Sequence, residues 1–280
     1  MISALQKLED NTIKLTITIP YTLVKKTWDE VFEQTVKQAN LAGFRRGKAP
    51  KKLVEEKIDK EKIKEDVLKK LLPQTYTEAV QQHKLRPIIN PKIHVEKIDN
   101  PSTSSGQGWQ FIAITCEPPV INLNNYKENI QKITAKAKIV IPGKQPQTPN
   151  FDEIVKTLLE NVSATIPSIL SEQEVNRLLS QMLDEIKTLG LTLEQYLAST
   201  NRSADDLRNE YQKKAENDIK LEFTLQKIAE IENITVEEKE IEEAIQKAKD
   251  EKEKKNLEAN RYLLASILRQ QKTLDFLKNL

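Results

Sequence analysis

The chain has little of what catalytic and metal sites are usually built from. Among its 280 residues there are one cysteine, Cys116, and two histidines, His83 and His94. A single cysteine cannot form an internal disulfide, which fits a reducing compartment. Neither histidine lies in a metal-ligand spacing, and no phosphate-cradling glycine motif is present. We therefore expect no metal, no cofactor and no active site, with Cys116 as a buried structural thiol.

Glycine and aromatic residues are also scarce. Six residues are glycine and 5% are aromatic, whereas 31% are charged and 38% are hydrophobic. Lys, Glu, Leu, Ile, Gln and Ala dominate, and these residues form or tolerate helices. The composition predicts a helix-rich protein with thin cores and a large surface.

Long apolar runs are absent from the sequence. No run approaches the roughly 20 residues that span a bilayer. The segment Met1–Asp10 contains acids and no apolar core, so it does not resemble a signal peptide. From this we expect a cytoplasmic chain that makes no membrane contact.

The first part of the chain alternates between strand and helix patterns. Residues 12–19 place Ile13, Leu15, Ile17 and Ile19 on one face, as a half-buried strand does. Helical patterns follow over 21–40, 53–58 and 63–85, the last interrupted by Pro73. Strand patterns then occur over 88–98 and 109–116. Because the 88–98 segment contains Pro91, we expect it to be an edge strand or to begin after that residue. Together they predict an α+β domain over residues 1–119.

A connector separates this domain from the rest. Residues 120–150 contain a stretch over 133–141 that we expect to be extended, then three prolines within 142–149. We interpret 120–150 as an extended, Pro-rich linker.

The second part reads as long helices with few breaks. One glycine, Gly190, and one proline, Pro167, occur in residues 151–280. We expect helix starts near Pro167 and near Asn201 or Ser203, a helix end at Gly190, and a solvated charged stretch over 247–255. Apolar residues recur at helical spacing in four sets: Val175, Leu178, Leu179, Met182, Ile186 and Leu189; Leu207, Tyr211, Ala215, Ile219 and Phe223; Ile241, Ala244, Ile245 and Ala248; Leu263, Leu264, Ile267 and Leu268. This part is predicted to be an elongated all-α domain.

Positive charge is concentrated in one short stretch. Residues 1–119 hold 20 Lys/Arg against 15 Asp/Glu, an excess of five, and residues 43–70 alone hold 11 against 6, the same excess. A local basic patch on a nearly neutral chain is typical of docking to a polyanion at one place.

The centre of that stretch is a loop of unusual composition: Gly43, Phe44, Arg45, Arg46, Gly47, Lys48, Ala49 and Pro50. Its glycines permit a tight turn, its arginines suit phosphate or carboxylate, and Phe44 could fill an apolar niche or stack on a base. Taken alone, the pattern fits a solvated loop, with Phe44 folded into the core, better than a binding loop.

These eight residues closely resemble the GFRxGKxP signature of trigger factor, a bacterial ribosome-associated chaperone. The strand–helix opening before the loop and the segment Ile166–Leu178 also resemble that family. The resemblance implies that Phe44, Arg45, Arg46 and Lys48 contact the large ribosomal subunit beside the tunnel exit, protein and rRNA alike. Gly43, Gly47 and Pro50 would shape the loop. It also implies a helical cradle for nascent or unfolded polypeptides, held without ATP, and a homodimer off the ribosome.

One departure from the family stands out. Trigger factors usually carry a prolyl-isomerase domain between the first domain and the helical arms, where this chain has only about residues 142–150. We therefore expect a short form without isomerase activity, and no enzyme. The alternatives are an rRNA-binding or ribosome-assembly factor that holds no clients, an isomerase with an unrecognised site, and a periplasmic chaperone with similar helices.

Overall fold

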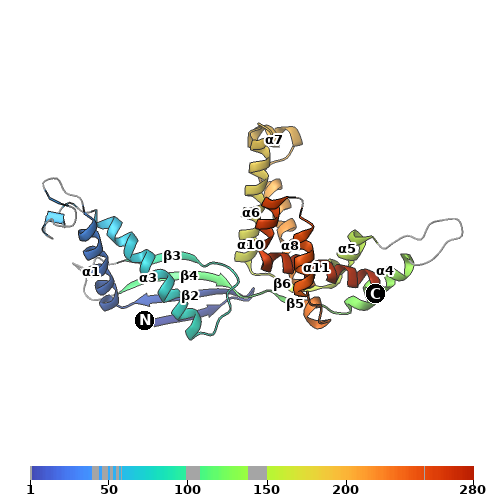
Figure 1. Cartoon of the computed structure of the whole chain (residues 1–280), viewed down its shortest axis with the longest axis horizontal. Helices are drawn as coiled ribbons and strands as arrows, with labels where there is room; N and C mark the ends of the chain where they lie inside the picture. Colours follow the sequence, from blue (N-terminus) through green and yellow to red (C-terminus); the bar gives the residue numbers. More distant parts are fainter. Residues whose placement is uncertain are drawn as a thin grey trace. The chain divides into compact units, whose positions relative to one another are not determined.

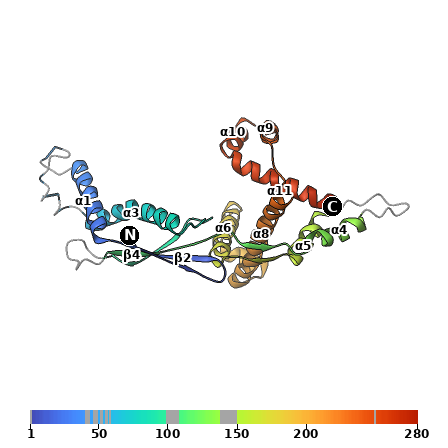
Figure 2. The same cartoon turned by 90° about the horizontal axis from the view of Figure 1, so that it is seen from below.

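The computed structural model describes residues 2–39, 44–45, 50, 53–54, 57, 59–98, 108–137, 150–248 and 250–280. The chain divides into two compact units, Met1–Pro118 and Pro119–Leu280, which Figure 1 and Figure 2 show in two views. Among the described residues, no helix has both the length and the apolar character needed to cross a bilayer.

The first unit is built on one antiparallel sheet. Its strands are β1 (Ile2–Lys7), β2 (Thr12–Ile19), β3 (Lys92–Lys97) and β4 (Trp109–Cys116), in the spatial order β1-β2-β4-β3. The central pair, β2 and β4, stays in register from Thr12 opposite Cys116 to Ile19 opposite Trp109. The strands predicted over 12–19 and 109–116 are confirmed, and β3 both starts after Pro91 and lies at an edge.

Strand β1 was missed by the sequence reading. It pairs with β2 through a turn over residues 8–11, in which Leu8 N–H donates to Thr12 O at 2.9 Å and Asn11 N–H donates to Leu8 O at 3.1 Å. Asn11 adopts φ 65°, a left-handed conformation that asparagine tolerates. Asp10 and Asn11 were the signal that could have revealed this hairpin.

Two helices cover one face of the sheet, as Figure 1 shows. Helix α1 (Tyr21–Gln38) and helix α3 (Lys60–Gln82) pack against each other and over the inward residues of β2. The core they close contains Ile13, Leu15, Ile17, Ile19, Val24, Val31, Ile63, Val67, Leu71, Trp109 and Phe111. The predicted 21–40 helix is confirmed, while the pattern over 53–58 lies largely outside the described residues.

The expected interruption at Pro73 is wrong, because α3 runs through it. Pro73 is exposed, so the hydrogen bond that it cannot donate is lost on the solvent side, where water can satisfy the orphaned carbonyl. Ile63, Val67 and Leu71 are buried against the sheet before it, and Thr75 after it. Burial along one face outweighs the local cost of the proline.

The second unit begins inside the segment that we expected to be extended. Strand β5 (Val120–Asn122) pairs with β6 (Ser163–Thr165), and residues Tyr126–Ala137 form helix α4. The expectation of an extended chain over 133–141 is therefore wrong as far as residue 137. The apolar face of α4 explains this, since Tyr126 and Ile130 are buried with residues far along the chain. The prolines over 142–149 lie outside the described residues.

The other elements of this unit are helical. They are α5 (Phe151–Asn161), α6 (Ser168–Thr188), α7 (Leu193–Thr200), α8 (Ala204–Ile231), α9 (Glu238–Gln246), α10 (Glu251–Ala259) and α11 (Arg261–Asn279). The fold class is confirmed as α+β followed by helical, with the short β5–β6 pair as an addition. Apart from Leu189 and Ala248, which follow α6 and α9, the four apolar sets lie within α6, α8, α9 and α11. Periodicity therefore located these helices well.

Two helical arms extend from one base in this unit. The base core contains Ile130 of α4, Ile154 and Leu158 of α5, Ile228 of α8 and Leu277 of α11. The first arm pairs α6 with the start of α8 and carries α7 at its end (Figure 1). The second arm pairs α11 with α9 and α10, which lie together away from the base (Figure 2).

Helix ends follow the expected signals, and of the two starts expected near α8 the structure selects Ser203. Gly190 has φ 72° just after α6, and Ser203 caps α8 by accepting from Asp206 N–H at 3.1 Å. Asn201 instead ends α7 in a left-handed conformation. Leu189, counted with the apolar face of α6, is 74% exposed because it lies beyond the helix end.

Candidate functional sites

The basic loop is anchored at both ends by a small apolar cluster. Helix α1 ends at Gln38, and its residue Val36 is buried with Val54, which follows the loop; Phe32 and Ala39 pack on this pair. Pro50 O accepts hydrogen bonds from the N–H groups of Leu53 at 3.0 Å and Val54 at 3.2 Å. The loop is therefore a closed excursion whose base is fixed by packing.

Two predicted docking residues, together with the loop's last residue, are described within this excursion. Phe44 is 41% exposed, and Arg45 and Pro50 are also exposed. Phe44 thus remains outside the hydrophobic core, contrary to the inward alternative. Gly43, Arg46, Gly47 and Lys48 lie outside the described residues.

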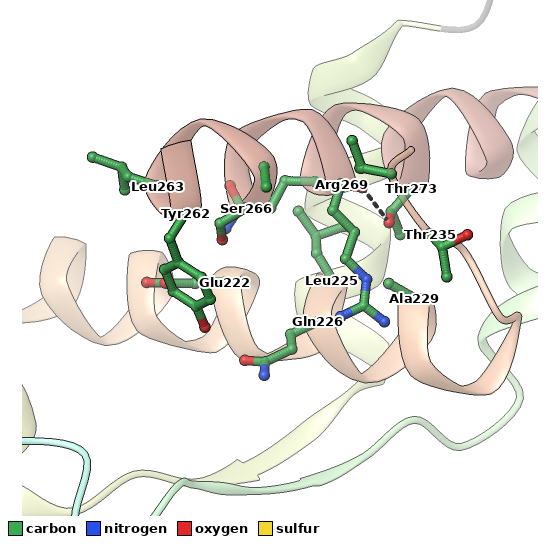
Figure 3. A pocket seen from close by; sticks show the side chains of 13 residues that line it. Glu222, Leu225, Gln226, Ala229, Thr235, Tyr262, Leu263, Ser266, Arg269 and Thr273 are labelled. Carbon is green, nitrogen blue, oxygen red and sulfur yellow. Dashed lines mark hydrogen bonds between the residues drawn. The ribbon is translucent and has the colours of Figure 1, made fainter. Parts of the chain in front are cut away.

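A groove lies between α8 and α11 in the second arm (Figure 3). Its volume is about 600 Å³, a size that suits part of a peptide or a small molecule. The lining residues are Glu222, Leu225, Gln226, Ala229, Thr235, Val236, Tyr262, Leu263, Ala265, Ser266, Arg269, Gln270 and Thr273. The lining combines aliphatic and aromatic side chains with uncharged polar ones and with the charged Glu222 and Arg269.

Large apolar side chains stand exposed along α11 beside this groove. Tyr262 is 91% exposed, Leu263 59% and Ile267 53%, whereas Leu264 is buried. Periodicity had grouped Leu263, Leu264, Ile267 and Leu268 as one face. The structure divides them, because only Leu264 and Leu268 pack with α9 through Ile241 and Ile245. The exposed residues form a patch of the kind that marks a binding surface.

The polar side chains of the groove differ in how they are used. Arg269 Nε donates to Ile234 O at 2.8 Å and Thr273 Oγ1 donates to Arg269 O at 2.7 Å, so both serve the arm itself. Within the described ranges, the side chains of Gln226, Ser266 and Gln270 make no hydrogen bond. These amides and hydroxyl are free to pair with the main chain of a bound polypeptide.

A cluster of carboxylates lies near the groove where α6 faces α8. Glu222 has a raised pKa, first because of burial and then because of the nearby Glu174. Burial also raises the pKa of Asp218, with Glu174 adding to the effect and Lys214 opposing it. Glu174 is itself held by Arg177, whose Nε and Nη2 donate at 2.8 and 2.6 Å. This cluster could not be found from the sequence, because its members come from two helices.

The remaining candidates are structural. Cys116 is fully buried, and burial raises the pKa of its thiol to about 11, as expected of an inert cysteine. His94 is exposed on the edge strand β3, and His83 Nε2 lies 3.0 Å from Ser3 Oγ. Trp109 is buried in the first core and Trp28 packs against it. Within the part of the chain that the structure describes, no group of acids, histidines or cysteine is placed to hold a metal.

Comparison with solved structures defines the class of fold. The whole chain superposes on 99% of a solved chain of the trigger factor chaperone, in a structure described as showing promiscuous substrate recognition in folding and assembly activities. The TM-score is 0.66 and the sequence identity is 13%. An α+β unit followed by a two-armed helical unit is thus a known architecture.

The chain belongs to the bacterial trigger factor family. The family model for bacterial trigger factor protein matches residues 1–144, and the model for its C-terminus matches residues 143–279. Trigger factor of Staphylococcus epidermidis is 33% identical over 127 residues, which is 45% of this chain and 28% of that protein. Trigger factor of Natranaerobius thermophilus is 31% identical over 127 residues, 45% of this chain and 27% of that protein. These alignments thus cover well under two thirds of the length of the relatives.

Proposed function

We propose that this chain is a chaperone that holds unfolded or nascent polypeptides without ATP on the exposed apolar surface of its second arm. The observation that carries the proposal is the groove between α8 and α11 with Tyr262, Leu263 and Ile267 exposed beside it. Apolar surface of this kind binds the apolar segments that drive aggregation of unfolded chains. Family membership and the chaperone neighbour support the same role.

The test is binding of a permanently unfolded protein, such as a reduced and carboxymethylated one, followed by fluorescence anisotropy. Changing Tyr262 and Leu263 together to Ser removes exposed apolar area at little cost to folding, because neither side chain is buried. We expect affinity to fall about tenfold, since one to two kcal/mol is the usual value of such a contact pair. The matched control is Tyr21→Ser, a tyrosine in the other unit. Equal affinity of the groove variant and the wild type would refute the proposal.

We further propose that the loop over residues 43–50 docks the chain on the large ribosomal subunit near the tunnel exit. The exposed Phe44 and Arg45 and the closed base of the loop support this role. The experiment is co-sedimentation with ribosomes, comparing wild type with the triple change Phe44→Ala, Arg45→Ala, Arg46→Ala. We expect the wild type to pellet with ribosomes and the folded variant to stay in the supernatant. If both pellet equally, or neither does, the proposal is wrong.

A second candidate is a ribosomal-RNA-binding or ribosome-assembly factor, favoured by the positive excess in residues 43–70. The solved neighbour is described with assembly activities as well as folding ones. Salt separates the two readings, because binding carried by several phosphate contacts falls steeply with ionic strength. Binding through insertion of Phe44 into a protein niche would weaken much less as ionic strength rises.

Absence of prolyl-isomerase activity is part of the proposal. The match to the N-terminal family model ends at residue 144 and the match to the C-terminal one begins at residue 143. This supports a chain with no further domain between these two parts. Catalysis of a proline-limited refolding phase would contradict this. We also propose a cytoplasmic location, which the ribosome partner requires, and leave a homodimer off the ribosome to sedimentation measurements.

A further inference from the structure

The two edges of the sheet in the first unit are protected to very different degrees. Strands β1 and β3 are the outer strands, and each leaves one side of its main chain unpaired in this sheet (Figure 1). An unpaired strand edge is a template for another extended chain unless charge, proline or a bulge blocks it. The contrast between the two edges therefore indicates where a further strand can add.

The β3 edge is protected by charge, by a preceding proline and by a bulge. Pro91 precedes the strand, and its six residues include Lys92, Glu96 and Lys97. Its pairing with β4 shifts register between Val95 and Lys97, which marks a bulge. A regular further strand is disfavoured on this side.

The β1 edge carries almost no such protection. Its six residues pair with β2 in unbroken register from Ile2 opposite Thr18 to Lys7 opposite Ile13. The strand contains no proline and one charge, Lys7, which is paired with Glu117 at 2.6 Å. Ile2 is 74% exposed and Leu5 38%. This edge has an unbroken register and two accessible large apolar side chains.

The hairpin shows which amides point outward. Leu8 N–H bonds to Thr12 O, and in an antiparallel pair the hydrogen-bonded positions alternate. Residues 2, 4 and 6 therefore direct their main-chain groups toward β2. Ser3, Leu5 and Lys7 direct theirs to the open edge.

We propose that β1 receives an extended segment of an unfolded polypeptide as an additional antiparallel or parallel strand. The added segment pairs with the main chains of Ser3, Leu5 and Lys7 and lays apolar side chains beside Ile2 and Leu5. Main-chain pairing is independent of sequence, so it suits clients of many kinds. This inference rests on the proposed holding of clients and gives the first unit a direct part in it.

The length of the edge favours a client over a second copy of this chain. Six residues of strand span about 20 Å. An edge of that length and one strand thick buries far less than the roughly 800 Å² per partner of a stable protein–protein interface. Transient capture of an extended segment is compatible with so small a contact, whereas a lasting dimer through it is not.

Residue-resolved amide exchange of the full chain, with and without the carboxymethylated unfolded protein, tests the inference. We expect client to slow exchange of the Ser3, Leu5 and Lys7 amides at least fivefold and to leave those of Ala4 and Gln6 unchanged. If anisotropy shows bound client while the three outward amides exchange as before, this inference fails and the proposed function stands. If no client binds at all, both the proposed function and this inference are refuted. The proposal would be overturned if, without client, the three outward amides exchanged more slowly as the protein concentration rose. That result would assign the edge to a second copy of the chain.

Two variants give an independent readout. Leu5→Pro removes an outward donor and no bond of the ladder, while Leu5→Ala removes the same side chain and keeps the donor. We expect client affinity to fall more for proline than for alanine. Should the proline variant fail to fold, Leu5→Lys places a protecting charge on the edge instead. Equal affinity of the folded edge variants and Leu5→Ala would count against the inference.

Discussion

Val36, near the end of α1, packs against Val54 on the far side of the basic loop, and both side chains are buried. This contact joins the two ends of an excursion that contains Phe44 and Arg45. Because it lies at the base of the loop, it fixes where the loop leaves and rejoins the unit without involving the exposed residues. The base of the loop is therefore held by two aliphatic side chains that lie outside the signature.

Replacing Val54 with Ala is expected to loosen this base. The change deletes two buried methyl groups, which costs about 2 kcal/mol of local stability. Trypsin cleavage after Arg45 should accelerate severalfold, because local opening exposes the chain to the protease. Leu53→Ala is the control, since Leu53 is 41% exposed. Equal cleavage rates for the two variants would show that the valine pair does not hold the loop.

Two glycines are expected to respond very differently to alanine. A Cβ at Gly108 would lie 1.8 Å from Ile19 O, a backbone atom that cannot move aside. Gly108→Ala should cost at least about 3 kcal/mol of unfolding free energy. A Cβ at Gly190 would meet nothing within 4 Å, but φ is +72° there, so Gly190→Ala should cost about 1 kcal/mol. Urea unfolding measures both, and similar costs would contradict the close approach at Gly108.

The carboxylates between α6 and α8 predict an unusual pH dependence. The folded-state pKa values of Asp218 and Glu222 are raised, so the folded chain binds these protons more tightly than the unfolded chain does. As pH falls from 7 through the raised pKa values, this contribution therefore increases the stability of the helical unit. Both side chains retain solvent exposure, so we expect a modest effect.

Glu222→Gln removes one of these groups. Its thermal midpoint should exceed that of the wild type at pH 7, and the two should converge as pH falls toward 5. Glu216→Gln, on the same helix, makes the same change in net charge and is the control. A Glu222→Gln midpoint equal to the control's at every pH would exclude the predicted repulsion with Glu174.

Cys116 offers a probe of unfolding in the first unit. It is fully buried, and burial raises its thiol pKa to about 11. At pH 8 the thiolate fraction is lower than that of a free thiol by more than about a hundredfold. Alkylation by iodoacetamide should therefore be slow in buffer and rise with the unfolded fraction in urea. Rapid alkylation of the folded chain would show that β4 opens locally.

Much of the fold follows from local sequence signals. Alternation predicted β2, and a 3.6-residue period predicted α1, α6, α8, α9 and α11, because burial on one face imposes those periods directly. The loop signature needed no structure, since eight residues with that chemistry stand together in the chain. The predicted interruption at Pro73 was wrong. A proline whose missing hydrogen bond faces solvent does not end a helix whose opposite face is buried.

Only the tertiary structure decided which apolar residues remain available. Leu263 and Leu264 are neighbours of identical chemistry, yet one is 59% exposed and the other is buried against α9. Periodicity marks a face as apolar, but its burial depends on which helix packs there, and that partner lies elsewhere in the chain. The same holds for β1, whose open edge is defined by the strand order of the sheet. Sequence alone thus determined the central strands, the long helices and the family, while long-range packing determined the groove and the edge at which clients are proposed to bind.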